Sequence, residues 1–280
     1  MSPSILRIPG ATITGVPIPP ADGRLVNGSL LLVDTTHPTN PYSGTLTHGS
    51  LVPNIAKTQA LAIGVAADNV EIFNTATATT KAKIERTASG SLHFTTSVTV
   101  DVLEERVGLA IPAALRSYLF ANKTHKFYVG LAVKTTRVGT AGATVGYLGG
   151  VFSGTNWGVG AQVALGLLAD GTFAGYPTSS DATRLGFDST TGTNANRFAA
   201  LTSNGLNNNL AADASSYVVG AGPYNGSAVN NSPSFILRSL YIEDLTVSGR
   251  THAQVSALDQ QAFQAGASGR WSGDTATPLA

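Results

Sequence analysis

Short apolar stretches separated by turn residues fill the sequence after residue 58, and this spacing limits its possible folds most. Strand-like stretches cover residues 60–66, 70–73, 91–103, 126–137, 145–152, 159–168, 184–187, 217–219 and 235–242. The alternation is clearest in residues 92–100, where one face carries Leu92, Phe94, Val98 and Val100. Such a period is typical of a strand with one face on a core and the other in solvent. Regular short strands with polar turns, including the hairpin signal Asp170-Gly171, favour a β-sandwich or barrel over βαβ units.

Two segments carry helix signals instead. Pro112 suits the first turn of a helix over residues 112–120. Thr251 and Gln254 have the spacing of a capping box for a second helix over residues 253–265. The apolar stripe of that helix consists of Val255, Leu258, Ala262 and Phe263. We expect Gly266 to end it, because glycine commonly follows the last helical turn.

The first 57 residues differ from the rest because proline and glycine interrupt every regular element. Residues 29–33 form the only good strand pattern, and the run Pro17-Ile18-Pro19-Pro20 should be extended and unable to lie inside a sheet. Two interpretations remain open, a flexible leader or an arm ordered against a neighbouring subunit. We therefore expect a turn-rich arm over residues 1–57 and a β-sandwich over residues 58–280 that ends in a short helix and tail.

Charge is scarce, and this excludes some classes of partner. The chain has 17 Lys+Arg and 16 Asp+Glu, so 12% of its residues are charged, against roughly 25% in an ordinary domain. No basic cluster is present to displace counterions from duplex nucleic acid or to bind an anionic membrane. No apolar stretch approaches the ~20 residues of a spanning helix, and residues 1–7 lack a signal-peptide pattern. We expect no nucleic-acid partner and no membrane insertion.

Motifs for catalysis and metal binding are missing from the sequence. The five histidines (His37, His48, His93, His125 and His252) show no metal-binding spacing, and there is no cysteine. Neither a GxSxG nucleophile elbow nor a phosphate-binding loop with its lysine is present. The carboxylate pairs Glu104-Glu105 and Glu243-Asp244 are adjacent, so their side chains should face opposite sides of a strand. We expect no enzyme, no cofactor and no metal, although carboxylates distant in sequence could still meet in the fold.

Two aromatic side chains in loop-like contexts are candidates for a glycan site. Trp157 stands beside Asn156, and Tyr224 stands beside Asn225, each pair between glycines. An exposed ring stacks on a sugar while an amide binds its hydroxyl groups, as lectin-like sites require. The alternative is that these rings cap the end of the core.

The C-terminal part of the chain resembles a known family. Residues 234–245 form a strand pattern, residues 246–251 read TVSGRT, and the helix of residues 253–265 follows. This order resembles the closing strand and short helix of concanavalin A-like jelly-roll domains, and the wording YIEDLTVSGRT…ALD is similar to C-termini of structural proteins of tailed bacteriophages. The resemblance implies an antiparallel β-sandwich of jelly-roll type with a helix on the sheet edge. The acidic triad of the glycosidase branch and the adjacent-Asp metal site of the legume-lectin branch are not found.

From this resemblance we expect a non-enzymatic structural protein of a tailed-phage virion, in the head, collar or tail. It would be assembled in the host cytoplasm, and its partners would be further copies of itself and other virion proteins. Freedom from cysteine protects a particle exposed to oxidants, and interface cores are poor in charge. The alternative is a carbohydrate-binding module of a receptor-binding protein, with a host surface glycan as partner. A hydrolase on the same fold is the third hypothesis.

Overall fold

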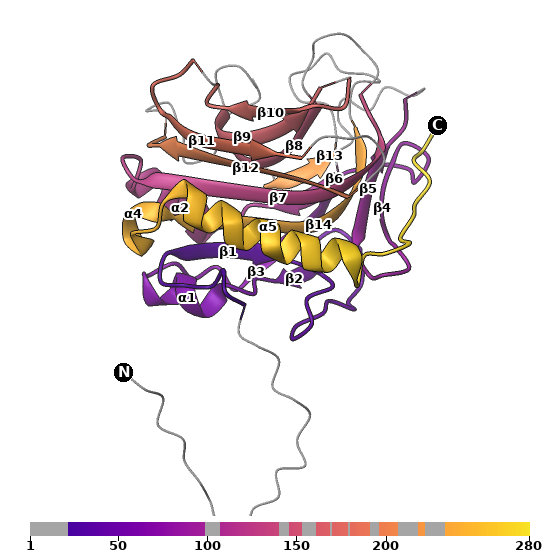
Figure 1. Cartoon of the computed structure of the whole chain (residues 1–280). Helices are drawn as coiled ribbons and strands as arrows, with labels where there is room; N and C mark the ends of the chain where they lie inside the picture. Colours follow the sequence, from indigo (N-terminus) through magenta and orange to yellow (C-terminus); the bar gives the residue numbers. More distant parts are fainter. Residues whose placement is uncertain are drawn as a thin grey trace, which may run out of the picture.

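The computed structural model shows two antiparallel sheets of seven strands packed face to face, which confirms the expected β-sandwich (Figure 1). The structure describes residues 22–98, 107–139, 146–152, 161–168, 170–178, 180–190, 196–206, 218–221 and 233–280. Sheet A has the order β11 (Arg184–Ser189), β12 (Asn196–Asn204), β7 (Lys126–Arg137), β14 (Ser234–Asp244), β5 (Leu92–Thr96) and β4 (Ala82–Arg86), with β1 (Ser29–Val33) also paired to β14. Sheet B has the order β10 (Phe173–Tyr176), β9 (Ala161–Leu167), β8 (Gly146–Phe152), β13 (Val219–Ala221), β6 (Val107–Ala110), β3 (Asn69–Asn74) and β2 (Leu51–Pro53). The hairpin expected at Asp170-Gly171 joins β9 to β10.

Strand β14 organises sheet A. All 11 of its residues are buried, and it pairs with β7 along one edge from Ser234 to Asp244. Its other edge is shared end to end: β5 pairs with residues 235–237 and β1 pairs with residues 240–243. The strand within the segment that carries the family resemblance therefore lies at the centre of sheet A.

Residues 22–57, which we expected in the arm, are part of the sandwich. They supply β1, which is fully buried against β14, and β2, which pairs with β3. The side chain of Asn54 accepts a hydrogen bond from Leu32 N and donates to Leu30 O, so it occupies the free edge of β1 like a further strand. The strand pattern of residues 29–33 was recognised from the sequence, but its partner was not, because the pairing joins residues about two hundred positions apart. Residues 1–21 of the expected arm lie outside the described residues.

The described residues contain four helices: α1 (Lys57–Ala62), α2 (Ala113–Ala121), α4 (Leu245–Ser248) and α5 (His252–Ser268). Helices α2 and α5 confirm the two predictions, and α5 begins with the capping box of Thr251 and Gln254. The expected end of α5 at Gly266 is wrong, since the helix continues to Ser268. A side chain at Gly266 would overlap the ring of Trp271, so this glycine makes room for the returning chain. None of the described helices is both long enough and apolar enough to cross a membrane.

Sheet A is covered on both faces. One hydrophobic cluster fills the space between the sheets, and a second lies between sheet A and α5, which crosses the outer face of the sheet (Figure 1). The second cluster includes Tyr128, Phe198, Tyr241, Phe263 and Trp271. The helix thus packs on the face of the sheet rather than on the edge that the family resemblance implies.

The outer face of β5, expected in solvent, is also buried, beneath neighbouring polar side chains and the C-terminal tail. His93 is fully buried, and its ring nitrogens lie 2.7 Å from Glu85 Oε1 and 2.8 Å from Thr136 Oγ1. Thr95 is also buried, and its hydroxyl accepts a hydrogen bond from the backbone of Leu279 in the C-terminal tail. Alternation of polar and apolar residues correctly assigned the two faces, but it could not tell solvent from a polar cover.

Candidate functional site

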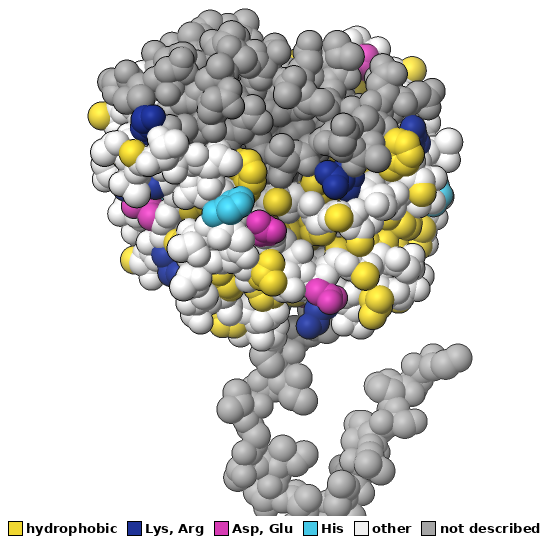
Figure 2. Space-filling view, turned by 180° about the vertical axis from the view of Figure 1, so that it is seen from behind, with side chains coloured by type: hydrophobic (Ala, Val, Ile, Leu, Met, Phe, Trp, Pro, Cys, Tyr) yellow, Lys and Arg dark blue, Asp and Glu magenta, His cyan; other side chains and the backbone are white. Residues whose placement is uncertain are grey.

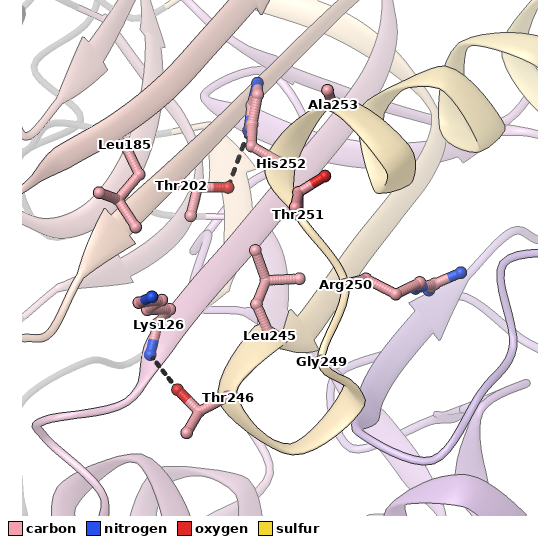
Figure 3. A pocket seen from close by; sticks show the side chains of 10 residues that line it. All are labelled: Lys126, Leu185, Thr202, Leu245, Thr246, Gly249, Arg250, Thr251, His252 and Ala253. Atoms are coloured by element: carbon pink, nitrogen blue, oxygen red, sulfur yellow. Dashed lines mark hydrogen bonds between the residues drawn. The ribbon is translucent and has the colours of Figure 1, made fainter.

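A cavity of about 670 Å³ opens where β14 ends and the chain turns into α5 (Figure 3). One wall is continuous in sequence and consists of Leu245, Thr246 and residues 249–253. The opposite wall comes from three strands of sheet A, which supply Lys126 from β7, Leu185 from β11 and Thr202 from β12. The cavity therefore exists only when the C-terminal segment lies on the sheet.

Local sequence signals shape the continuous wall. Asp244 caps α4, because its Oδ1 accepts hydrogen bonds from the backbone N–H groups of Thr246 and Val247. Gly249 ends this short helix with a φ of 71°, a conformation that favours glycine. Thr251 then begins α5 two residues later. The chain bends at Gly249 between the end of α4 and the start of α5, and the cavity lies at this bend.

The guanidinium of Arg250 faces away from the cavity (Figure 3). It binds both carboxylate oxygens of Glu243, and it donates to the backbone oxygen of Arg24 and to the hydroxyl of Tyr241. Glu243 is fully buried, so its charge requires this cation. The aliphatic part of Arg250 therefore lines the cavity, while its guanidinium pairs with the buried carboxylate of Glu243.

Lys126 is the other basic residue that lines the cavity, and its ammonium group is not used in an ion pair with a described carboxylate. Its side chain is exposed, and no carboxylate of the described residues lies within ion-pair distance of its Nζ. Its backbone N–H donates to Thr246 Oγ1 at 2.8 Å, which fixes the start of β7 against α4. The ammonium group is therefore free to meet a ligand.

A hydrogen-bonded chain of three side chains crosses the far end of the cavity. His252 Nδ1 lies 2.8 Å from Thr202 Oγ1, and His252 Nε2 lies 3.0 Å from Asp188 Oδ2. The hydroxyl of Ser256 also donates to Asp188. Burial lowers the pKa of His252 more than Asp188 raises it, so the imidazole is neutral at pH 7.

This chain has the connectivity of a nucleophile, a base and an orienting carboxylate, but its geometry suits a clamp. Thr202 is fully buried, so its hydroxyl does not reach a substrate in the cavity. The ring of His252 fits against Gly186, where any side chain would overlap it. The contacts fix the first turn of α5 on β11 and β12 and give the cavity a rigid end.

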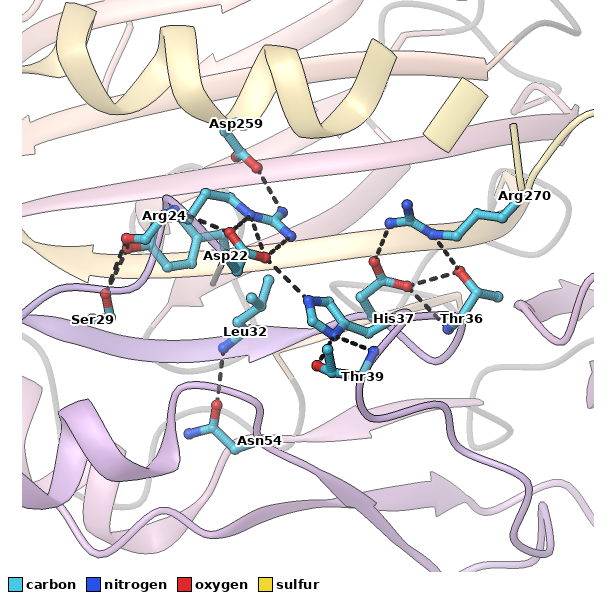
Figure 4. Close-up of polar contacts among 12 residues, drawn as sticks. Asp22, Arg24, Ser29, Leu32, Thr36, His37, Thr39, Asn54, Asp259 and Arg270 are labelled. Atoms are coloured by element: carbon cyan, nitrogen blue, oxygen red, sulfur yellow. Dashed lines mark hydrogen bonds and ion pairs between the residues drawn. The ribbon is translucent and has the colours of Figure 1, made fainter. Parts of the chain in front are cut away.

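A second polar cluster lies beneath the middle of α5 and is closed to ligands (Figure 4). Arg24 bridges Asp22 and Asp259 with Nη–O distances of 2.7 and 3.0 Å. Tyr128 donates to the same Asp259, and His37 contacts Asp22 at 3.2 Å. Burial opposes ionisation of Asp22, but hydrogen bonds from His37 and Arg24 prevail and hold its pKa well below its usual range. This cluster joins the start of the described chain to α5.

The candidate glycan residues Asn156, Trp157, Tyr224 and Asn225 lie outside the described residues, as does the pair Glu104-Glu105. Of the other carboxylate pair, Glu243 binds Arg250, whereas Asp244 accepts hydrogen bonds from Tyr118 and is 2.6 Å from His125 Nδ1. The two groups thus serve separate partners. Within the described ranges, no set of three or more His, Asp or Glu side chains is placed to hold a metal ion.

Sequence reasoning did not identify the cavity residues. Lys126, Leu185, Thr202 and Thr246 come from four segments and match no motif. The capping box at Thr251 was the one local signal near the site, and it located a helix start rather than a cavity.

No protein-family model matches the sequence, and no curated protein matches it. Among solved structures, the chain is similar to the Trypanosoma rangeli sialidase in complex with a difluoro-KDN, with a TM-score of 0.44, 13% identity and coverage of 90% of this chain and 36% of that chain. It is also similar to the binding domain of botulinum neurotoxin serotype D/C, with a TM-score of 0.39, 9% identity and coverage of 82% of this chain and 52% of that chain. The chain thus spans about a third of the sialidase and about half of the toxin domain. No function is transferred from either.

Proposed function

We propose that the chain is a non-enzymatic structural protein of a tailed-bacteriophage virion. The observation that carries this proposal is the position in the fold of the segment whose sequence resembles C-termini of tailed-phage structural proteins. Residues 234–251 form the fully buried strand β14, the cap of α4 and the turn into α5. The resemblance therefore concerns the part of the chain on which the rest of sheet A is built.

The surface supports the same proposal. On the described part of the face opposite α5, charged side chains are few and form no single patch, and hydrophobic side chains occur among uncharged ones (Figure 2). Leu51 and Leu61 are 56% and 61% exposed. Charge depletion suits a protein that works among neighbouring subunits, because interface cores are poor in charged residues.

Mass spectrometry of particles tests this proposal directly. Particles produced from the genome that encodes the chain are purified by density gradient and digested. We expect peptides of this chain at a stoichiometry of several copies per particle. Its absence from intact particles, with other virion proteins detected, would refute the role.

The expected arm is tested by deleting residues 1–21 only. This deletion spares every described strand and helix, whereas a deletion of residues 1–57 would remove β1 from sheet A. We expect the truncated protein to keep its melting temperature but to be lost from particles. A truncated protein that still assembles would remove the arm from the proposal.

The second candidate is a carbohydrate-binding role on the same particle, which the open cavity beside α5 favours. A glycan array tests it with the native chain and with Trp157→Ala and Tyr224→Ala, the variants of the two aromatic candidates. A host-surface glycan that binds and is lost in one variant supports that site. An array without any hit contradicts the role.

A further inference from the structure

We propose that the cavity between α4, α5 and the end of sheet A binds an acidic saccharide, with Lys126 as the contact for its anionic group. This inference deepens the carbohydrate-binding role proposed above and rests on it. It assigns that role to residues other than the aromatic candidates, and it names the ligand class.

Hydrogen-bond donors with no partner in the described part of the chain face the cavity. Lys126 offers an ammonium group with no carboxylate partner among the described residues. Thr246 accepts from the backbone of Lys126, which leaves its O–H free to donate. Lys126 and Thr246 therefore present free donors to the cavity, whereas the donors of Thr202, Thr251, His252 and Arg250 are engaged by other residues. Such a site selects a ligand that brings acceptors.

The described carboxylates near the cavity are all engaged by other residues. Glu243 is held by Arg250 and Tyr241, on the side away from the cavity. Asp188 accepts from His252 and Ser256 and is not among the residues that line the cavity. Asp244 is fully buried and is engaged by Tyr118, His125 and the first turn of α4. No lining residue is itself acidic, so an anion entering beside Lys126 meets no exposed carboxylate in the wall.

Aliphatic side chains on two walls of the cavity suit the ring of a saccharide. Leu185 is 46% exposed at one wall, and Leu245 lies at the other. Aliphatic surface of this kind packs against the C–H face of a sugar ring, while the hydroxyl of Thr246 binds one of its hydroxyl groups. A cavity of about 670 Å³ has room for one or two sugar rings. A carboxylated sugar therefore matches the ammonium group of Lys126, the hydroxyl of Thr246 and the aliphatic walls together.

Titration calorimetry with D-glucuronate, D-glucose and acetate at low salt tests the inference, with amide chemical shifts of His252 and Ala253 as the local readout. We expect glucuronate to bind and to move these two signals. Glucose should bind about tenfold more weakly, the loss of one charge-assisted hydrogen bond. Acetate, which lacks the ring, should bind more weakly than glucuronate as well.

Two lysine variants separate the site from general charge effects. Lys126→Met should reduce glucuronate affinity to the level of glucose, whereas Lys57→Met, an exposed lysine on α1, should leave it unchanged. Glucuronate binding that is equal in Lys126→Met and in the native chain would overturn this inference. If array glycans then still bind and depend on Trp157 or Tyr224, the carbohydrate-binding role survives at another site. Failure of every saccharide to bind would overturn both.

Discussion

Sheet A is covered by two layers of different kinds. The layer between the sheets consists of hydrophobic side chains from both sheets, and it includes Phe94 and Phe235 of sheet A, whose ring centroids are 5.5 Å apart. The layer under α5 mixes aromatic rings with buried ions, including Arg24 and Asp259. Apolar packing gives stability without strict direction, whereas buried ions are tolerated only where each has a partner in the right place.

This difference explains why the candidate site lies beside α5. Gly130 on β7 leaves room for the carboxylate of Asp259, and Gly186 on β11 leaves room for the ring of His252. These two close approaches, one near the middle of α5 and one at its start, fix the distance of the helix from the sheet and its position along the sheet. A cavity whose wall includes the first turn of α5 requires this accuracy.

The largest effect should follow from damage to the layer between the sheets. Phe94→Ala removes a fully buried ring, which costs about 3–5 kcal/mol of unfolding free energy. Because this layer joins both sheets, we expect one cooperative transition. In a Trp157→Phe background, fluorescence of Trp271 and far-ultraviolet circular dichroism should shift to the same lower urea midpoint. Separate midpoints in this variant would contradict a shared core.

Damage to the layer under α5 should cost somewhat less and should act locally. Arg24→Met leaves Asp22 and Asp259 without their cation, a loss of about 3 kcal/mol for a broken buried pair. We expect the Trp271 signal to change at lower urea than the strand signal, because α5 leaves the sheet first. Arg116→Met on α2, where no ion pair is present among the described residues, is the matched control and should change neither midpoint. Coincident midpoints in Arg24→Met would show that both layers unfold as one unit.

Acid should weaken the layer under α5 by a smaller amount. Burial raises the pKa of Asp274, but hydrogen bonds from Ser89, Thr87 and Arg238 outweigh it and lower the pKa, and the pKa of Asp22 is lowered as well. A lowered pKa contributes stability above the unfolded value of about 3.9, and this is lost as pH falls further. Asp259 has the opposite sign, because burial raises its pKa and protonation relieves that cost.

The urea midpoint of the Trp271 signal at pH 7 and at pH 3 measures this balance. We expect a lower midpoint at pH 3, because the unfolded chain then binds protons on Asp22 and Asp274 more readily than the folded chain does, and only Asp259 acts in the opposite direction. Asp274→Asn should be less stable than the native chain at pH 7 and should show a smaller further loss at pH 3. An equal pH dependence in both proteins would exclude Asp274 as a contributor.

The sequence predicted some elements of this molecule and missed others. Residues 60–66, expected as a strand, form the end of α1 and the turn after it, and β4 and β12 were not predicted. Alternation located β5, and the capping box located the start of α5, since both signals are local. The partner of β1 and the burial of His93 depend on segments far away in sequence, so no local pattern contains them. The cavity has the same origin, because Lys126 and Thr246 meet only after the sheet has formed.

The smallest effect tests whether the start of α5 depends on its cap or on the sheet below it. Thr251→Ala removes the side chain that accepts from Gln254 N, at a cost of about 1 kcal/mol. We expect faster amide exchange over residues 254–256 and unchanged exchange in β14. Ser268→Ala, at the other end of the same helix, is the control and should leave residues 254–256 unaffected. Unchanged exchange in Thr251→Ala would mean that the contacts of His252 with Thr202, Asp188 and Gly186 hold the first turn by themselves, and that the sheet rather than the cap fixes the cavity wall.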